Sequence, residues 1–213
     1  MRFAGIIEWA EGYNKRGSYS PIGQLFHWGM AAAFVYQLAF GWWLGRQHVG
    51  ADKYLGYQLH GTIGMTIMVV AALRFLWRSR IAGPELVDDD TFSGKASALL
   101  QYFFYVCFFG LPITGWVMWS TFPGELSLSI AGLITVPNLP FHELSPGLQA
   151  ELMRYGTNLH QVLIWGAMLA VPGHAGAAIL HHFVKGDRVL ESMIPDLNGP
   201  EVEGVVGAGK GKG

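Results

Sequence analysis

Residues 160–174 read HQVLIWGAMLAVPGH, an apolar segment with a histidine at each end and no charged residue between them. In a helix, fourteen residues rise about 21 Å and complete nearly four turns, so both histidines lie on one face at two depths. An ionisable side chain inside a long apolar segment is costly and by default marks a functional site. This segment therefore predicts a membrane helix with two sites along one face.

The rest of the chain has the composition of a membrane protein. Of its 213 residues, 51% are hydrophobic and 14% are charged, whereas a soluble domain carries about a quarter charged residues. Four apolar segments reach the length of about 20 residues that a helix needs to cross a hydrocarbon core. These segments are 22–44, 57–77, 98–119 and 159–183.

The four segments predict an all-α fold, an integral membrane four-helix bundle. We expect this transmembrane domain over residues 21–195, with an N-terminal cytoplasmic segment at 1–20 before it and a disordered tail at 196–213 after it. Ser20-Pro21 predicts the start of the first helix, because serine is a favoured N-cap and proline a favoured first helical residue.

Lysine and arginine are distributed unevenly over the connecting segments. Eleven lie in the N-terminal segment, the second connection with its flanks, and the tail. The other three, Arg46, Lys53 and Arg154, lie in the first and third connections. Cytoplasmic loops carry the excess of these residues, so both termini are expected in the cytoplasm. A net charge of −1 without a basic stripe gives no indication of nucleic acid as a partner.

Four of the eight histidines lie inside the apolar segments. With the N-terminus in the cytoplasm, His27 lies near the inner end of the first helix and His60 near the outer end of the second. The fourth helix adds one histidine at each level. The pairs are His60 with His160 at the outer level and His27 with His174 at the inner level. Two histidine pairs at two depths of a bundle are what two six-coordinate b haems require.

Other interpretations of these histidines compete with haem. Any one of them alone is explained equally well as a histidine satisfied by hydrogen bonds, and only their joint geometry favours ligands. Zinc usually takes three or four ligands at one depth, whereas each level offers two histidines and no carboxylate or thiolate. A haem-free metal transporter is a minor alternative. The single cysteine, Cys107, lies in an apolar segment and is expected to be a packing residue.

Arg74 lies fourteen residues after His60 and is expected to face the same groove at the inner level. The propionates of an inner haem need a cation at that level. The alternative is that Arg74 is a snorkelling anchor at the membrane surface.

Small residues flank the histidines, as a porphyrin lying flat against a helix requires, although close helix packing explains each of them singly. They include Gly29, Gly61, Gly64, Gly173 and Gly176.

Three further regions allow only coarse predictions. His181 and His182 end the fourth segment, where placement at the membrane surface is simpler than contact with a haem or a quinone. The third connection is rich in proline and glycine and predicts a loop with a short interfacial helix at 146–155. Residues 3–9 are equally compatible with an amphipathic surface helix and a frayed terminus.

The chain also resembles the prokaryotic cytochrome b561 family over residues 19–195. The matching stretches are Tyr19-Ser20, Phe26-His27-Trp28, His60 to Gly64 with Arg74, Leu111 to Gly115 (LPITG), His160 through His174 to Phe183, and Met193-Ile194-Pro195. The resemblance implies that His27, His60, His160 and His174 are axial ligands of two b haems in the inner (plasma) membrane of a bacterium. Pro172, which predicts a kink before His174, departs from the family pattern, as do the third connection and the N-terminal extension.

Bis-histidine ligation leaves no open iron position and favours outer-sphere electron transfer over oxygen chemistry. The resemblance implies exchange of electrons with quinone, with superoxide as one donor described for the family. We therefore expect a quinone-linked oxidoreductase in lipid that passes electrons from a periplasmic donor, a small molecule or a partner protein, to ubiquinone. The alternative is a haem-bearing anchor and electron conduit of a dehydrogenase or hydrogenase complex. No catalytic residue is assigned, and whether the chain is itself an enzyme stays open.

Overall fold

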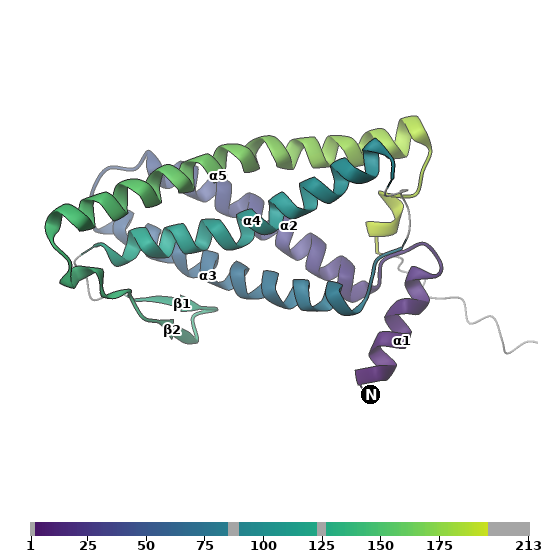
Figure 1. Cartoon of the computed structure of the whole chain (residues 1–213), viewed down its shortest axis with the longest axis horizontal. Coiled ribbons are helices and arrows are strands. Elements are labelled where there is room, and N and C mark those ends of the chain that lie inside the picture. Colours follow the sequence, from purple (N-terminus) through teal and green to yellow (C-terminus); the bar gives the residue numbers. More distant parts are fainter. Residues whose placement is uncertain (1–2, 85–89, 123–126, 196–213) are drawn as a thin grey trace, which may run out of the picture.

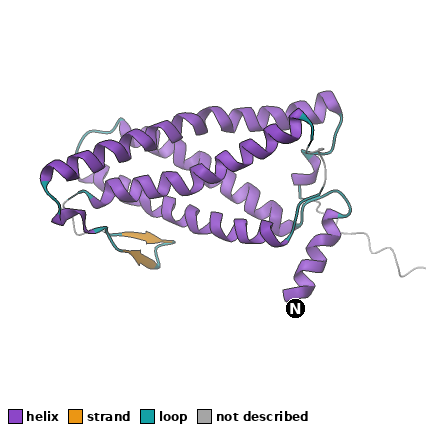
Figure 2. Cartoon of the chain, viewed as in Figure 1, coloured by secondary structure: helices purple, strands orange, loops and turns teal. Residues whose placement is uncertain are grey.

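Four long helices make up most of the structure, a computed structural model that describes residues 3–84, 90–122 and 127–195 (Figure 1). The tail expected at 196–213 lies outside the described residues. The long helices are α2 (Pro21–Gly45), α3 (Ala51–Arg80), α4 (Phe92–Ser120) and α5 (Pro146–Leu180). Helix α3 packs on both α2 and α4, and α4 packs on α5. Figure 2 shows that helix dominates the described chain, so the predicted helical fold is confirmed.

Side-chain caps begin three of the long helices. The hydroxyl of Ser20 accepts a hydrogen bond from the Gly23 N–H at 3.3 Å, as the sequence predicts for the start of α2. Thr91 caps α4 and Ser145 caps α5 in the same way. A cap of this kind satisfies a backbone N–H that has no partner within the helix.

Three of the four predicted spans, α3, α4 and α5, are long and apolar enough to cross a membrane. Helix α2 is not among these three. Its 25 residues, about 38 Å of helix, are sufficient in length, but Gln24, His27 and Gln37 lower its apolar character. Length and composition thus agree with the predicted spans for three helices, and the four-helix membrane bundle and its orientation stay predictions.

The third connection differs from its prediction. It contains an antiparallel hairpin of β1 (Leu128–Ile130) and β2 (Ile134–Val136), followed by the short turn η1 (Pro140–Glu143). Strands of three residues are too short to recognise from an alternating pattern. The interfacial helix expected at 146–155 is instead the beginning of α5, so the prediction of a separate helix is wrong.

Both ends of the chain add smaller elements to the bundle. Helix α1 (Phe3–Asn14) precedes the bundle, and the Asn14 side chain donates a hydrogen bond to the carbonyl of Ala82 after α3. Helix α5 continues through Pro172 to Leu180 and passes into the π-helical turn η2 (His181–Lys185). In Figure 1, α1 and the hairpin lie toward opposite ends of the molecule.

A core in the middle of the bundle receives buried side chains from all four long helices. Its members include Met30, Phe34, Ile67, Ala71, Cys107, Phe108, Leu111, Leu163 and Ala167. Cys107 is fully buried there, in agreement with the packing role expected from the sequence.

Close approach of α4 and α5 depends on Gly166, and Gly166→Ala is expected to destabilise the protein. A Cβ atom at this position would lie 2.6 Å from Cζ of Phe103. Overpacking of this kind costs about 1–3 kcal/mol, which offsets or exceeds the gain of about 1 kcal/mol when alanine replaces glycine in a helix. The thermal unfolding midpoint in detergent should fall relative to Gly147→Ala, also in α5, where no atom lies within 4 Å. Equal midpoints in the two variants would contradict the close approach.

Candidate functional site

The structure brings His27 of α2 and His174 of α5 together at one level of the bundle. Their ring centroids lie 6.0 Å apart, with an angle of 49° between the planes. The ring of Phe104, from α4, stands edge-on to His174 at 5.6 Å. His27 is half-buried and His174 is exposed. This is the inner pair of the sequence analysis.

The rings of His60 and His160 belong to the other level, and each lies beside a glycine of a neighbouring helix. A Cβ atom at Gly41 of α2 would lie 2.9 Å from Cε1 of His60. A Cβ atom at Gly115 of α4 would lie 3.7 Å from Cε1 of His160. The two histidines lie close enough to interact electrostatically. Within the described chain, the buried Nδ1 of His60 has no hydrogen-bond partner.

A threonine determines which nitrogen of His160 carries the proton. The hydroxyl of Thr114 lies 2.7 Å from Nδ1 of His160 and 2.8 Å from the carbonyl oxygen of Gly110. A hydroxyl has one proton, and a carbonyl can only accept, so Thr114 donates to Gly110 and accepts from the imidazole. His160 therefore carries its proton on Nδ1, and Nε2 keeps a free electron pair of the kind that binds a metal.

Gln37 joins α2 to the backbone of α3 at the His60 level. Its side-chain nitrogen donates a hydrogen bond of 2.7 Å to the carbonyl oxygen of His60, and the glutamine side chain is buried. Because that carbonyl belongs to the histidine itself, the contact fixes the position of His60 relative to α2.

Arg74 lies near the inner pair. Its guanidinium carbon is 5.9 Å from the ring centre of Tyr105. The guanidinium also lies close enough to His27 and His174 to interact with them electrostatically. Among residues 3–84, 90–122 and 127–195, no carboxylate forms an ion pair with Arg74. This half-buried cation therefore has no anionic partner within the described protein.

The small residues are arranged differently from the expectation. Gly61, next to His60, contacts the hairpin, since a Cβ atom there would lie 2.8 Å from Cδ2 of Leu128. The glycines that face histidine rings are instead Gly41 and Gly115. Gly29 and Gly173 have no atom within 4 Å of an added Cβ, so neither faces a packed neighbour.

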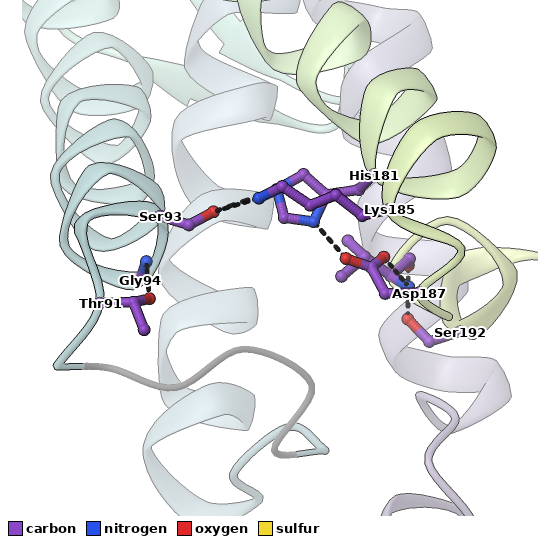
Figure 3. A network of polar contacts seen from close by, with 8 residues as sticks. Thr91, Ser93, Gly94, His181, Lys185, Asp187 and Ser192 are labelled. Carbon is purple, nitrogen blue, oxygen red and sulfur yellow. Dashed lines mark hydrogen bonds and ion pairs between the residues drawn. The ribbon is translucent and has the colours of Figure 1, made fainter.

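His181 is part of a polar network at the His174 end of the bundle (Figure 3). Its Nδ1 is hydrogen-bonded to the carboxylate of Asp187, and its Nε2 lies 3.0 Å from the hydroxyl of Ser93 and 3.2 Å from Nζ of Lys185. His182 lies 3.8 Å from a carboxylate oxygen of Glu191. The network joins the beginning of α4 to the segment after α5. His181 therefore makes specific contacts in addition to the placement at the membrane surface that the sequence predicts.

Thr114, Gln37 and Gly41 were not recognised as site residues from the sequence. Thr114 lies within the LPITG stretch, but a single threonine in an apolar helix has many uses. A buried glutamine such as Gln37 inside an apolar segment is a usable signal, because its amide must find a partner there. No three His, Cys, Asp or Glu side chains gather as a metal site in the part of the chain that the structure describes.

Histidines paired at two levels of a bundle of membrane-length helices are typical of one class of protein. Its members are membrane proteins that hold their cofactor inside a helical bundle. The comparisons with known proteins then identify the family. A family model described as prokaryotic cytochrome b561 matches residues 18–196. The chain belongs to this family, and it is accordingly a multi-pass bacterial membrane protein of haem-based electron transfer that binds haem b.

Two proteins of Escherichia coli (strain K12) are among its relatives. Cytochrome b561 homolog 2 is 29% identical over 184 residues, which cover 83% of this chain and 90% of the relative. Cytochrome b561 homolog 1 is 24% identical over 152 residues, which cover 68% of this chain and 79% of the relative. The family expected from the sequence is thus confirmed.

Thr114→Val should weaken haem binding at the His160 level. The valine removes the hydroxyl that accepts from the Nδ1–H, and loss of such a partner costs about 10–100-fold in metal affinity. Titration of the haem-depleted protein with haemin would measure the change. Thr114→Ser should retain wild-type affinity, and so should Thr121→Val, whose hydroxyl bonds the Met118 carbonyl. Wild-type affinity in Thr114→Val would refute the role of this hydroxyl.

Asp187→Asn should lower stability at neutral pH but not at low pH. Burial alone raises the pKa of Asp187, but hydrogen bonds from His181 and the Val189 N–H outweigh it and hold the pKa below its ordinary value. The stabilisation is therefore complete above the unfolded-state pKa of about 3.9 and is lost as the pH falls through the lower folded-state value.

We expect the unfolding midpoint of Asp187→Asn to fall by about 2–4 °C at pH 7, the shift for about 1 kcal/mol in a chain of this size. The difference from the wild type should shrink below about pH 4. Glu8→Gln, at an exposed position of α1, is the control. A difference that stays constant with pH would contradict the charged hydrogen bond.

Proposed function

We propose that the chain transfers electrons across the membrane through two b haems, with His27 and His174 as axial ligands of one and His60 and His160 as axial ligands of the other. The membrane is the bacterial inner membrane, residues 21–195 form its four-helix domain, and both termini face the cytoplasm. The excess of lysine and arginine in the cytoplasmic segments supports this orientation.

The observation that carries the proposal is the distance between His27 and His174. A metal–imidazole bond of about 2 Å, plus about 1 Å from that nitrogen to the ring centre, separates two axial rings by about 6 Å across one metal ion. The ring centroids lie 6.0 Å apart. The donor set also fits, since a pair of imidazoles is a known ligand combination for low-spin haem iron.

At the other level, the supporting observations concern the chemistry of the nitrogens. His160 is held with a free electron pair on Nε2 by its hydrogen bond to Thr114. Because residue 41 is glycine, the His60 ring can lie against α2, where a side chain at residue 41 would collide with it. The Gln37 hydrogen bond fixes the backbone of His60. The His160 ring is thus oriented by its own hydrogen bond and the His60 backbone by Gln37, which is the kind of support that a ligand site needs.

The position of Arg74 supports the binding of an anionic group at the inner level. Its guanidinium has no carboxylate partner among the described residues and lies near both inner histidines. The propionates of a haem are anions that an arginine binds through paired hydrogen bonds. Haem b supplies one-electron chemistry at its iron when bound. With haem bound, Arg74 would compensate the propionate charge inside a region of low dielectric.

Aromatic side chains fill the space between the two levels and exclude water. Phe34 packs edge-on to Phe108 at 5.1 Å, and Phe104 stacks on Phe108 at 6.2 Å. Phe104 in turn contacts His174. A dry interior between the two sites prevents side reactions with water and protons.

Ubiquinone is the proposed acceptor, and a periplasmic small molecule such as superoxide, or a redox protein, is the proposed donor. The family and the two histidine pairs at two depths support an electron relay. The purified chain, supplied with superoxide, should then reduce ubiquinone without any other protein. Reduction that requires a copurifying dehydrogenase would instead assign the chain to the conduits of larger complexes.

His174→Ala should reduce the haem content from about two to about one per chain, because one axial ligand of the inner haem is lost. The pyridine haemochrome assay and the reduced-minus-oxidised spectrum of detergent-purified protein measure this. His142→Ala is the matched control, since His142 is exposed in the η1 turn. Two haems in His174→Ala, or a wild-type protein with one haem, would refute the pairing.

A further inference from the structure

The β1–β2 hairpin runs along α3 instead of away from the bundle (Figure 1). Its contacts with α3 progress along the helix. The side chain of Gln58 donates to the carbonyl of Ser127 at 3.0 Å, and the N–H of Ala131 donates to the hydroxyl of Thr66 at 2.7 Å. The hairpin tip therefore points along α3 toward the middle of the bundle.

The contacts with α3 give the depth of the hairpin. Helix α3 is one of the three membrane-length helices, and its apolar segment begins at residue 57. Thr62 and Thr66 lie about 7 and 14 Å inside that boundary at 1.5 Å per residue. Since the hydrocarbon core is about 30 Å thick, the hairpin tip reaches the depth of acyl chains within one leaflet.

The contact between α4 and the base of the hairpin agrees with this depth. Trp116 donates a hydrogen bond of 3.0 Å from its indole nitrogen to the carbonyl of Pro137, just after β2. Trp116 lies near the end of the apolar segment 98–119, where tryptophans gather at membrane surfaces. The base of the hairpin thus lies at the surface and its tip inside.

The exposed side chains of the hairpin are apolar. Leu133 is 87% exposed and Ile134 is 62% exposed. From residue 127 to residue 139 the chain contains no charged residue. The opposite side of the hairpin packs Leu128 and Val136 against Met65 and Trp119. An apolar tip of this kind is costly in water and favourable among lipid chains.

The backbone at the α3-facing edge of β1 is also compatible with lipid. Open strand edges are excluded from hydrocarbon because their N–H and C=O groups have no partner there. Here the N–H groups of Ser129 and Ala131 donate to the hydroxyls of Thr62 and Thr66, at 3.3 and 2.7 Å. Two residues of strand span about 6.6 Å and four residues of helix rise about 6 Å, so the two spacings match.

We propose that the hairpin at residues 128–136 is embedded in the leaflet at the His60 end of the bundle, where Leu133 and Ile134 contact lipid acyl chains. Thr62 and Thr66 hold it there by bonding the edge of β1. The surface that this chain presents to lipid at this end is therefore partly strand. This inference does not depend on haem ligation or on the direction of electron flow.

The test places a spin label at Leu133→Cys in full-length, haem-loaded protein in nanodiscs, with Cys107→Ala as background. Oxygen concentrates in hydrocarbon and a nickel chelate concentrates in water. We expect the label to collide mainly with oxygen. The control label is Glu143→Cys, because the Glu143 side chain is 73% exposed in the turn after the hairpin, and it should collide mainly with the chelate.

Two results would overturn the proposal. Chelate accessibility at 133 equal to that at 143 would mean that the tip is in water. A label at 133 that neither reagent reaches would mean that a second protein surface covers the tip. An unchanged visible spectrum in both labelled proteins would show that either result concerns the hairpin and not the haem sites.

A second measurement tests the threonine contacts. Thr66→Val removes the acceptor of the Ala131 N–H while keeping the shape of the side chain. We expect the label at 133 to become more mobile and to gain chelate collisions, and Thr66→Ser should restore the original values. Identical spectra in all three proteins would refute the anchoring role of Thr66.

Discussion

Inside hydrocarbon, every polar group must find its partner within the protein, and most of this structure follows from that constraint. The long helices satisfy their own backbones. Several polar side chains find a partner within the bundle, as the amide nitrogen of Gln37 does with the His60 carbonyl and the Thr114 hydroxyl does with His160. Among the described residues, four buried side-chain atoms have no hydrogen-bond partner: Oε1 of Gln37, Nδ1 of His60, the Tyr105 hydroxyl and Oδ1 of Asn138. The first two belong to residues that are hydrogen-bonded to each other at the His60 level.

The long helices and the two histidine levels could be predicted from the sequence because both depend on local geometry. Apolar length determines whether a segment can span, and a spacing of fourteen residues places His160 and His174 on one face whatever surrounds them. The hairpin, and the glycines that face the rings, depend on which helix faces are adjacent. Gly41 lies beside His60 through the packing of α2 on α3, which no local pattern in either segment encodes.

The two ends of the bundle are closed by different means. At one end, hydrogen bonds between His181 and both Ser93 and Asp187 join the beginning of α4 to the segment after α5. At the other end, the hairpin covers α3 and packs against Trp119. Between them lies a core that draws on all four long helices. The paired histidines occupy the two boundaries between this core and the ends, where side chains from distant parts of the sequence meet.

Helix α5 runs without interruption through both His160 and His174. The distance between these two residues along the helix is therefore fixed. A bilayer changes thickness with its lipids, and bundles respond by tilting. Two sites on separate helices would slide relative to each other during such a response. Two imidazoles on one helix cannot separate unless its hydrogen bonds break. In the proposed two-haem arrangement, the rate of electron exchange would depend steeply on the distance between the centres, and a shared helix would hold one ligand of each centre at a constant spacing.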